Sequence, residues 1–274
     1  LNVILWVVSV LAVLVGVGWL GFQVKPRPFP PRQGAGPGPE AARPSPSLPA
    51  PVRRFFEAAV GPEIPLTQTA YTAGRARMRP FGLWVAARYE FTYIAGRAYH
   101  HCIEVCWFGL PVMKIDERYQ DGRAVMHLPF GAVEGEPQID EAAERGLRAE
   151  TIWLPPLYAA DPGLRWEAID DTTARLIVPY RGDEHRYTLR FDPDTGLLTD
   201  LRTVRYRDAQ SVGRIGWGGA ALGWRTLNST LVPDRLTTEW EDQGGPWVIW
   251  DVEQVAYNVD VSDRLPGAAG QGAG

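Results

Sequence analysis

The sequence has little cysteine and little lysine. Cys102 and Cys106 are its two cysteines, too few for a disulfide framework. If both lie on one strand, their Cα atoms are about 13 Å apart at ~3.3 Å per residue, which is beyond the reach of a disulfide. The cysteines therefore do not indicate an oxidising compartment. Lysine occurs only at Lys25 and Lys114, and we attribute the preference for arginine to a GC-rich bacterial coding bias.

An excess of positive charge is also missing. The net charge is −4 and the pI is near 5.7, whereas nucleic-acid-binding domains present a basic face. The sequence contains no dinucleotide-binding fingerprint, P-loop, zinc-protease or nucleophile-elbow motif. These absences argue against nucleic acid as a partner and against the common enzyme classes. We assign no cofactor, no metal ligand and no catalytic residue.

One long hydrophobic run lies at the N-terminus. From Val3 to Phe22 the residues are almost all apolar or small, and about 20 such residues span a bilayer core. We predict a transmembrane helix over residues 1–24. A cleaved signal peptide is the alternative, although neither a basic start nor a small-residue cleavage site is visible. Lys25 and Arg27 follow the run, which favours the cytoplasmic face of a bacterial membrane for the rest of the chain but leaves the side open.

Proline and glycine dominate residues 25–51. Such a composition does not build a core and predicts an extended, partly polyproline II linker. At ~3.1 Å per residue this linker could hold the following domain up to about 80 Å from the bilayer. Residues 263–274 are rich in glycine and alanine and predict a disordered tail. The folded, β-rich domain is therefore expected at residues 52–262.

Most of this domain alternates between apolar and polar residues. Val85 to Tyr93 shows the pattern, which is typical of a half-buried antiparallel strand. Turn signals such as Asp121-Gly122 separate the segments, and short strands divided by turns predict an antiparallel meander. The predicted strands are residues 66–78, 85–93, 97–107, 111–119, 124–130, 164–169, 174–180, 185–191, 197–206, 222–232, 235–241 and 247–257.

A helical period separates the two series of strands. Small and apolar residues recur there at steps of three and four, which forms one narrow stripe. They are Ile139, Ala142, Ala143, Gly146 and Leu147. The pairs Glu141–Arg145 and Glu144–Arg148 are expected on the remaining, outer surface. Because glycine costs roughly 1 kcal/mol in a helix, we expect another backbone to pack closely against Gly146.

The predicted fold class follows from this order of elements. It is mainly β: a curved, half-barrel-like antiparallel sheet packed on one central α-helix at residues 139–150, preceded by a single transmembrane helix. A shorter helix is predicted at the start of the domain, because apolar residues keep helical spacing there. They are Val52, Phe55, Phe56 and Ala59.

Tryptophan suggests where a ligand would bind. Beyond the first 24 residues lie nine of the 11 tryptophans, and core packing accounts for most such rings. A curved sheet with one helix would also leave an apolar groove that holds an acyl chain. We interpret Gly216-Trp217-Gly218-Gly219 as a mobile loop at the lip of this groove. The candidate ligand-binding residues are Trp153, Trp217, Trp224, Trp240 and Trp247.

Metal-binding residue types share one face of the predicted strand 97–107. They are His100, Cys102, Glu104 and Cys106. Alternate residues on a strand are ~6.6 Å apart, so one ion would reach two neighbours at most. A Cys–His nucleophile pair is also disfavoured, because consecutive side chains point to opposite faces and no third, orienting group is identifiable.

Several motifs occur in an order that resembles a known family. They are residues 48–55 (LPAPVRRF), 79–81 (RPF), 116–122 (DERYQDG), 153–155 (WLP), 165–171 (RWEAIDD) and 191–197 (FDPDTGL). Together they resemble a family of uncharacterised bacterial membrane-anchored proteins, described as a domain of unknown function. The likeness covers roughly residues 48 to 257, and it implies an N-terminal hydrophobic helix but no activity. More distantly, the order of strands, helix and strands resembles the half-barrel of periplasmic lipoprotein carriers.

The leading functional prediction is non-enzymatic binding of a lipid or other apolar ligand near the membrane. A structural or protein-interaction module is the alternative, and a hydrolase of unknown type comes third. An apolar groove would favour the first, a filled core with an exposed apolar edge the second, and clustered titratable groups in a cleft the third.

Overall fold

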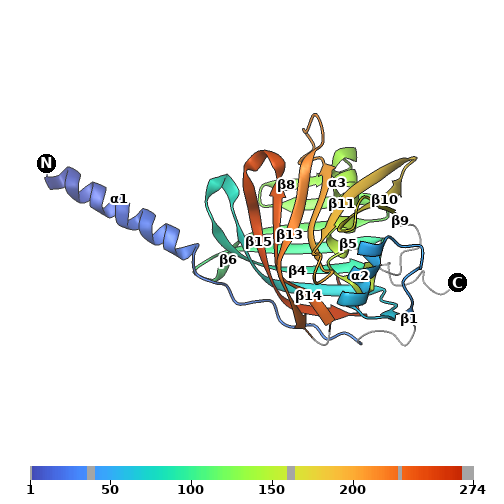
Figure 1. The fold of residues 1–274 in the computed structure, drawn as a ribbon. Helices are drawn as coiled ribbons and strands as arrows, with labels where there is room; N and C mark the ends of the chain where they lie inside the picture. Colours follow the sequence, from blue (N-terminus) through green and yellow to red (C-terminus); the bar gives the residue numbers. More distant parts are fainter. Residues whose placement is uncertain (1, 36–40, 159–163, 228–229, 267–274) are drawn as a thin grey trace.

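A computed structural model describes residues 2–35, 41–158, 164–227 and 230–266. Figure 1 shows an N-terminal helix that projects from a β-rich body. This helix, α1 (Asn2–Gly21), is the one among the described residues that is long and apolar enough to cross a membrane, with a hydropathy of 2.6. The other helices are α2 (Ala50–Ala59), α3 (Pro137–Thr151), α4 (Pro155–Tyr158) and the 3-10 turns η1 (Pro80–Gly82) and η2 (Glu241–Gln243).

Within the described residues, 13 strands form one antiparallel sheet. In chain order they are β3 (Thr69–Met78), β4 (Val85–Ile94), β5 (Ala98–Trp107), β6 (Leu110–Gln120), β7 (Arg123–Leu128), β8 (Gly131–Glu134), β9 (Arg165–Ala168), β10 (Thr173–Tyr180), β11 (Asp183–Phe191), β12 (Leu198–Arg205), β13 (Ile215–Leu227), β14 (Thr230–Trp240) and β15 (Gly245–Tyr257). A separate pair joins β1 (Ala41–Ala42) to β2 (Ile64–Pro65).

The sheet consists of two meanders joined at its centre. Its order is β8-β7-β6-β5-β4-β3-β15-β14-β13-β12-β11-β10-β9, so the first long strand pairs with the last one. Because β8 and β9 are the two edges, the chain between them has to cross the open side of the sheet. Helix α3 makes this crossing and contacts β6 and β7 in one half and β12 in the other (Figure 1). The predicted fold, a curved antiparallel sheet on one central helix, is confirmed.

Helix α3 supplies side chains to two hydrophobic cores. Ile139, Ala143 and Leu147 belong to the core under β3–β6 and β15. Ala149 in the last turn of α3, and Ile152 directly after the helix, belong to the core under β10–β14, which α2 covers. The stripe of small and apolar residues therefore faces the sheet as predicted, because a helix crossing a concave face buries most of its circumference.

The glycine-rich segment around Trp217 is not a loop. It belongs to β13 and pairs with β12 and β14, so the prediction of a mobile lip is wrong. A Cβ atom at Gly218 would clash with the carbonyl oxygen of Leu201, and one at Gly219 with that of Thr237. Glycine is needed here because the neighbouring strands approach closely.

The predicted strand 222–232 also needs correction. Residues up to Leu227 end β13 and Thr230 begins β14, so the predicted segment runs across a hairpin. The predicted strand 235–241 is correspondingly the second half of a longer strand. Residues 228–229, between the two strands, lie outside the described part of the chain.

The charged residues of α3 are buried, contrary to expectation. The pairs Glu141–Arg145 and Glu144–Arg148 form, with N–O distances of 2.9 and 3.1 Å, but Glu141, Glu144 and Arg145 are inside the protein. The curved sheet surrounds the helix: His185 on β11 binds Glu144, and Arg214, in the loop before β13, binds Glu141. The helix therefore has a polar core contact where the sequence predicted a solvent face.

The surroundings of Gly146 also differ from the prediction. A Cβ atom there would lie 3.3 Å from the Nη1 atom of Arg205 and 3.5 Å from the Oε1 atom of Glu150. The close neighbours are thus the ends of side chains. The expectation that another backbone packs against Gly146 is not met within the described part of the chain.

The proline-rich segment lies along the sheet where its residues are described. Ala86 N donates to Phe22 O at 2.8 Å, and Ala35 N donates to Asn258 O at 3.2 Å. Arg32 also pairs with Asp263 at 2.7 Å. Residues 22–35 therefore do not act as a free spacer in this structure, and the domain lies directly beside the end of α1.

Candidate functional site

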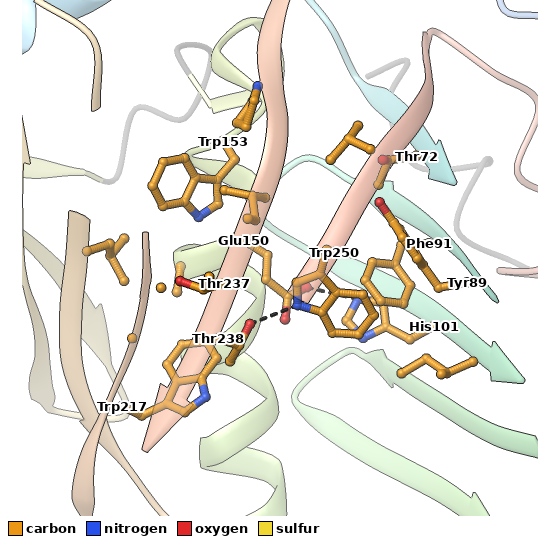
Figure 2. A pocket seen from close by; sticks show the side chains of 18 of the residues that line it. Thr72, Tyr89, Phe91, His101, Glu150, Trp153, Trp217, Thr237, Thr238 and Trp250 are labelled. Atoms are coloured by element: carbon orange, nitrogen blue, oxygen red, sulfur yellow. Dashed lines mark hydrogen bonds and ion pairs between the residues drawn. The ribbon is translucent and has the colours of Figure 1, made fainter. Parts of the chain in front are cut away.

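A cavity of about 430 Å³ lies between the concave face of the sheet and α3. Figure 2 shows aromatic rings from β4, β13 and β15 around it, with Glu150 and Trp153 entering from the region of α3. Alternation along the strands directs these rings inward. The aromatic lining consists of Tyr89, Phe91, Tyr93, His101, Trp153, Trp217, Trp240, Trp247 and Trp250.

Four of the five predicted tryptophans line the cavity. They are Trp153, Trp217, Trp240 and Trp247. Trp224 does not: its ring lies 5.9 Å from that of Phe55 on α2, and its Nε1 donates to Leu198 O at 3.1 Å. Trp224 therefore belongs to the filled core beneath α2.

Trp250 also lines the cavity, although it is not among the five predicted residues, and a β-bulge explains its orientation. Trp247 and Trp250 are three positions apart, and a regular strand would direct them to opposite faces. Thr238 pairs with Val248 and Glu239 with Pro246, which leaves Trp247 as the additional residue of the bulge. Both rings consequently face the cavity. The alternation of a regular strand would not predict that Trp247 and Trp250 share a face.

A buried polar cluster forms one wall of the cavity. His101 Nε2 lies 3.0 Å from Glu150 Oε2, and Tyr93 donates a 3.0 Å hydrogen bond to the same oxygen. The His101 ring stacks on Tyr99 with centroids 4.0 Å apart, and on its other side Phe91 lies 4.1 Å away. Burial, and then the charge of Glu150, raise the pKa of Tyr93 well above its ordinary value, so its hydroxyl stays protonated.

Two arginines lie above the tryptophans at one end of the cavity. The guanidinium of Arg205 is 4.8 Å from the Trp217 ring, and that of Arg207 is 4.7 Å from the Trp240 ring. Arg207 also pairs with Asp242. The Nε atom of Arg205 is buried and makes no hydrogen bond within the described part of the chain. These cations are placed to meet an anionic or polar group of a ligand.

The cavity reaches the surface at the end where β14 turns into β15. Gln243 in η2 is the one exposed residue among the described residues that line it. At the other end the lining residues Thr72, Val232 and Val255 are buried. The lining residues are therefore more accessible at this turn than at the far end of the cavity.

The residues that suggested a metal lie on the opposite face of β5. His100 Nε2 is 3.0 Å from Asp116 Oδ1, and Glu104 pairs with Arg88. Both cysteines are free and buried, and burial raises the pKa of the Cys102 thiol to about 11. Within the residues that the structure describes, no group of three or more potential metal ligands is found.

A family profile matches residues 40–252. The chain belongs to DUF6544, a family of unknown function. This membership confirms the resemblance seen in the sequence motifs. A search of curated proteins finds no match.

Several solved structures are similar to this DUF6544 chain. A DUF1329 family protein from Desulfovibrio piger is 14% identical with a TM-score of 0.44, covering 78% of this chain and 92% of that one. A LolA superfamily protein from Nitrosomonas europaea is 11% identical with a TM-score of 0.43 over 75% and 91%. A putative outer membrane lipoprotein-sorting protein domain from Vibrio parahaemolyticus is 5% identical with a TM-score of 0.40 over 76% and 88%. The distant likeness to lipoprotein carriers that the sequence predicted is found among these matches.

Proposed function

We propose that this DUF6544 chain binds a lipid or another apolar ligand in the cavity, close to a membrane. The observation that carries the proposal is the aromatic pocket of about 430 Å³ between the sheet and α3. Its volume is within the roughly 300–1,000 Å³ of small-molecule sites, which are mostly apolar with a few placed polar groups. Here Arg205, His101 and Glu150 are such groups.

The proposed arrangement places this binding domain at a bilayer. Helix α1 has the length and hydropathy of a membrane span, and we propose that it anchors the domain of residues 52–262 in a bacterial cytoplasmic membrane. Lys25 and Arg27 after α1 favour the cytoplasmic face by the positive-inside rule. A ligand drawn from the bilayer is then the nearest apolar molecule to the cavity.

Mass spectrometry of the organic extract tests the proposal. The full chain is purified from membranes in mild detergent, and the extract is searched for a stoichiometric lipid. Leu236→Trp fills the cavity, because Leu236 lines it. Leu222→Trp is the matched control, since Leu222 is exposed on the neighbouring strand. Lipid that merely surrounds α1 is the same in both variants, whereas a cavity ligand is lost only from Leu236→Trp. Equal recovery from both variants would contradict the proposal.

The polar cluster favours a hydrolase as the second candidate. His101 Nε2 lies 3.0 Å from Glu150 Oε2 beside the pocket, and these two residue types can serve as general acid and base. Among the described lining residues, however, there is no serine or cysteine to act as a nucleophile. Loss of ester-hydrolysing activity in Glu150→Gln, with the lipid still bound, would support this candidate. A chain with neither ligand nor activity would favour the protein-interaction module.

A further inference from the structure

Six of the 12 large exposed hydrophobic side chains that the structure describes outside α1 lie at turns at one end of the sheet. Leu110 is 69% exposed and Phe130 is 99% exposed, although both are large apolar residues. We call the set at the β3–β4, β5–β6 and β7–β8 turns the apolar rim. It consists of Leu83, Trp107, Phe108, Leu110, Val112 and Phe130.

The strand register places these turns at the same end. The pairs Met78–Val85, Trp107–Leu110 and Leu128–Gly131 close the three hairpins. In an antiparallel sheet alternate strands run in the same direction, so β3, β5 and β7 all end on this side. Scattered surface hydrophobic residues are ordinary, but a gathered set marks an interaction surface.

Two residues of the apolar rim form hydrogen bonds with the end of α1. Phe108 N donates to Gly21 O at 2.7 Å, and the Trp107 indole donates to Gly18 O at 3.0 Å. Gly21 has no side chain, and a Cβ atom there would clash with the Trp107 ring. Figure 1 shows α1 leaving the body beside β6, away from the sheet. The β5–β6 turn thus lies at the level of the last turn of the apolar helix.

This geometry points to a lipid bilayer as the partner of the rim. We propose that the β3–β4 and β5–β6 turns insert into the bilayer interface beside α1 and hold the opening of the cavity against the lipid. A bilayer crossed by α1 ends near Gly21, where Trp107 and Phe108 supply the aromatic side chains that prefer the interface. Lys25 and Arg27 are exposed just beyond it, where phosphate groups of lipids would meet them.

The docked position would also bring the accessible end of the cavity to the bilayer. This step rests on the proposed function, the binding of an apolar ligand in the cavity. The pair Trp240–Gly245 closes the β14–β15 turn, and β14 runs in the same direction as β3. Gln243, the exposed lining residue, therefore lies at the end of the sheet that carries the rim. A lipid could enter the cavity from the bilayer without crossing water.

Spin labelling of the full chain tests the docking. The chain is reconstituted in vesicles of phosphatidylcholine and phosphatidylglycerol, with Cys102→Ala and Cys106→Ala as background. A nitroxide is placed at Leu110→Cys and, as the control, at Leu222→Cys, which is exposed on β13. At Leu110 the ratio of collisions with oxygen to collisions with a water-soluble nickel chelate is expected to be several-fold higher than at Leu222. Equal, aqueous ratios at Leu110 and at a second rim position, Leu83→Cys, would overturn the docking.

Uptake kinetics test the route into the cavity. The double variant Phe108→Ser, Leu110→Ser keeps α1 as its anchor. Uptake of a pyrene-labelled fatty acid from vesicles, followed by energy transfer from tryptophan, is expected to be several-fold slower with the same final occupancy. An unchanged rate would overturn the proposed route. Absence of uptake in the unmodified chain would contradict the proposed function and leave the spin-label result standing.

Discussion

Two aromatic regions of the concave face differ in packing: one is filled by its rings, and the other lines a cavity. Beneath α2 the rings of Phe55 and Phe191 are 5.6 Å apart and that of Trp224 is 5.9 Å from Phe55, and this region is filled. Between the two hydrophobic cores, Phe91 and Trp250 line an open cavity. Aromatic content does not distinguish the two regions. The difference is that α2 covers the first, whereas α3 alone closes the second.

Charge placed on the buried face of α3, the helix that lies against both halves of the sheet, should have the largest effect. Leu147 on α3 is 0% exposed, so Leu147→Asp buries an unpaired carboxylate against the sheet. We expect the loss of a folded domain, with a destabilisation above about 4 kcal/mol. Urea unfolding followed by circular dichroism measures it. Leu222→Asp, at an exposed position, should unfold near the unmodified midpoint. Equal midpoints for both variants would remove α3 from the centre of the fold.

Removing one ring from each region compares them directly. Phe55→Ala in the filled region should cost about 3–5 kcal/mol, because it leaves a new void. Phe91→Ala should cost clearly less, since it enlarges a space that already exists and loses mainly the transfer free energy of the ring. Both are read from urea unfolding of the same chain. Equal losses would mean that the cavity is closed by repacking in solution.

The regions also differ in what the sequence could predict. Alternation predicted the strands β3–β7 and β10–β12, and it matches the burial most clearly in β11, which has one buried face. It failed at Gly216 to Gly219, where close strand approach requires glycine and removes the alternating side chains. It predicted β15 but gave no sign of the bulge at Trp247, because a bulge shifts the period without a composition signal.

Long-range burial explains the remaining differences. The sequence predicted that the acids of α3 face solvent, because i,i+4 ion pairs usually lie on the exposed side of a helix. In the structure, however, the Nε atom of Arg214, in a distant loop, lies 2.6 Å from Glu141 Oε1. The candidate tryptophans were chosen by residue type alone. Residue type could not show that Trp224 packs beneath α2 whereas Trp217 lines the cavity. The location of each ring depends on which helix covers its strand.

Alkaline pH should weaken the cavity wall through buried tyrosines. Burial and then Glu150 raise the pKa of Tyr93, and burial and then Glu117 raise that of Tyr99. The folded state therefore keeps protons that the unfolded chain loses above about pH 10, so stability is full below pH 10 and falls as the pH rises. Tyr93→Phe should reduce the slope of unfolding free energy against pH between 9 and 11. In the filled region Tyr187 is affected in the same direction, and Tyr187→Phe is its counterpart. An unchanged slope in both variants would place the alkaline transition elsewhere.

The smallest effect is expected at Gly146, beside the cavity. An alanine methyl there would meet only the end of Arg205, at 3.3 Å, and of Glu150, at 3.5 Å. Both side-chain ends can move by a few tenths of an ångström, whereas alanine gains up to about 1 kcal/mol of helix propensity over glycine. Gly146→Ala should therefore raise the melting temperature slightly. Gly218→Ala, where the new methyl would clash with the carbonyl of Leu201, should lower it. A clear loss of stability in Gly146→Ala would mean that a backbone does pack against this glycine, as the sequence had predicted.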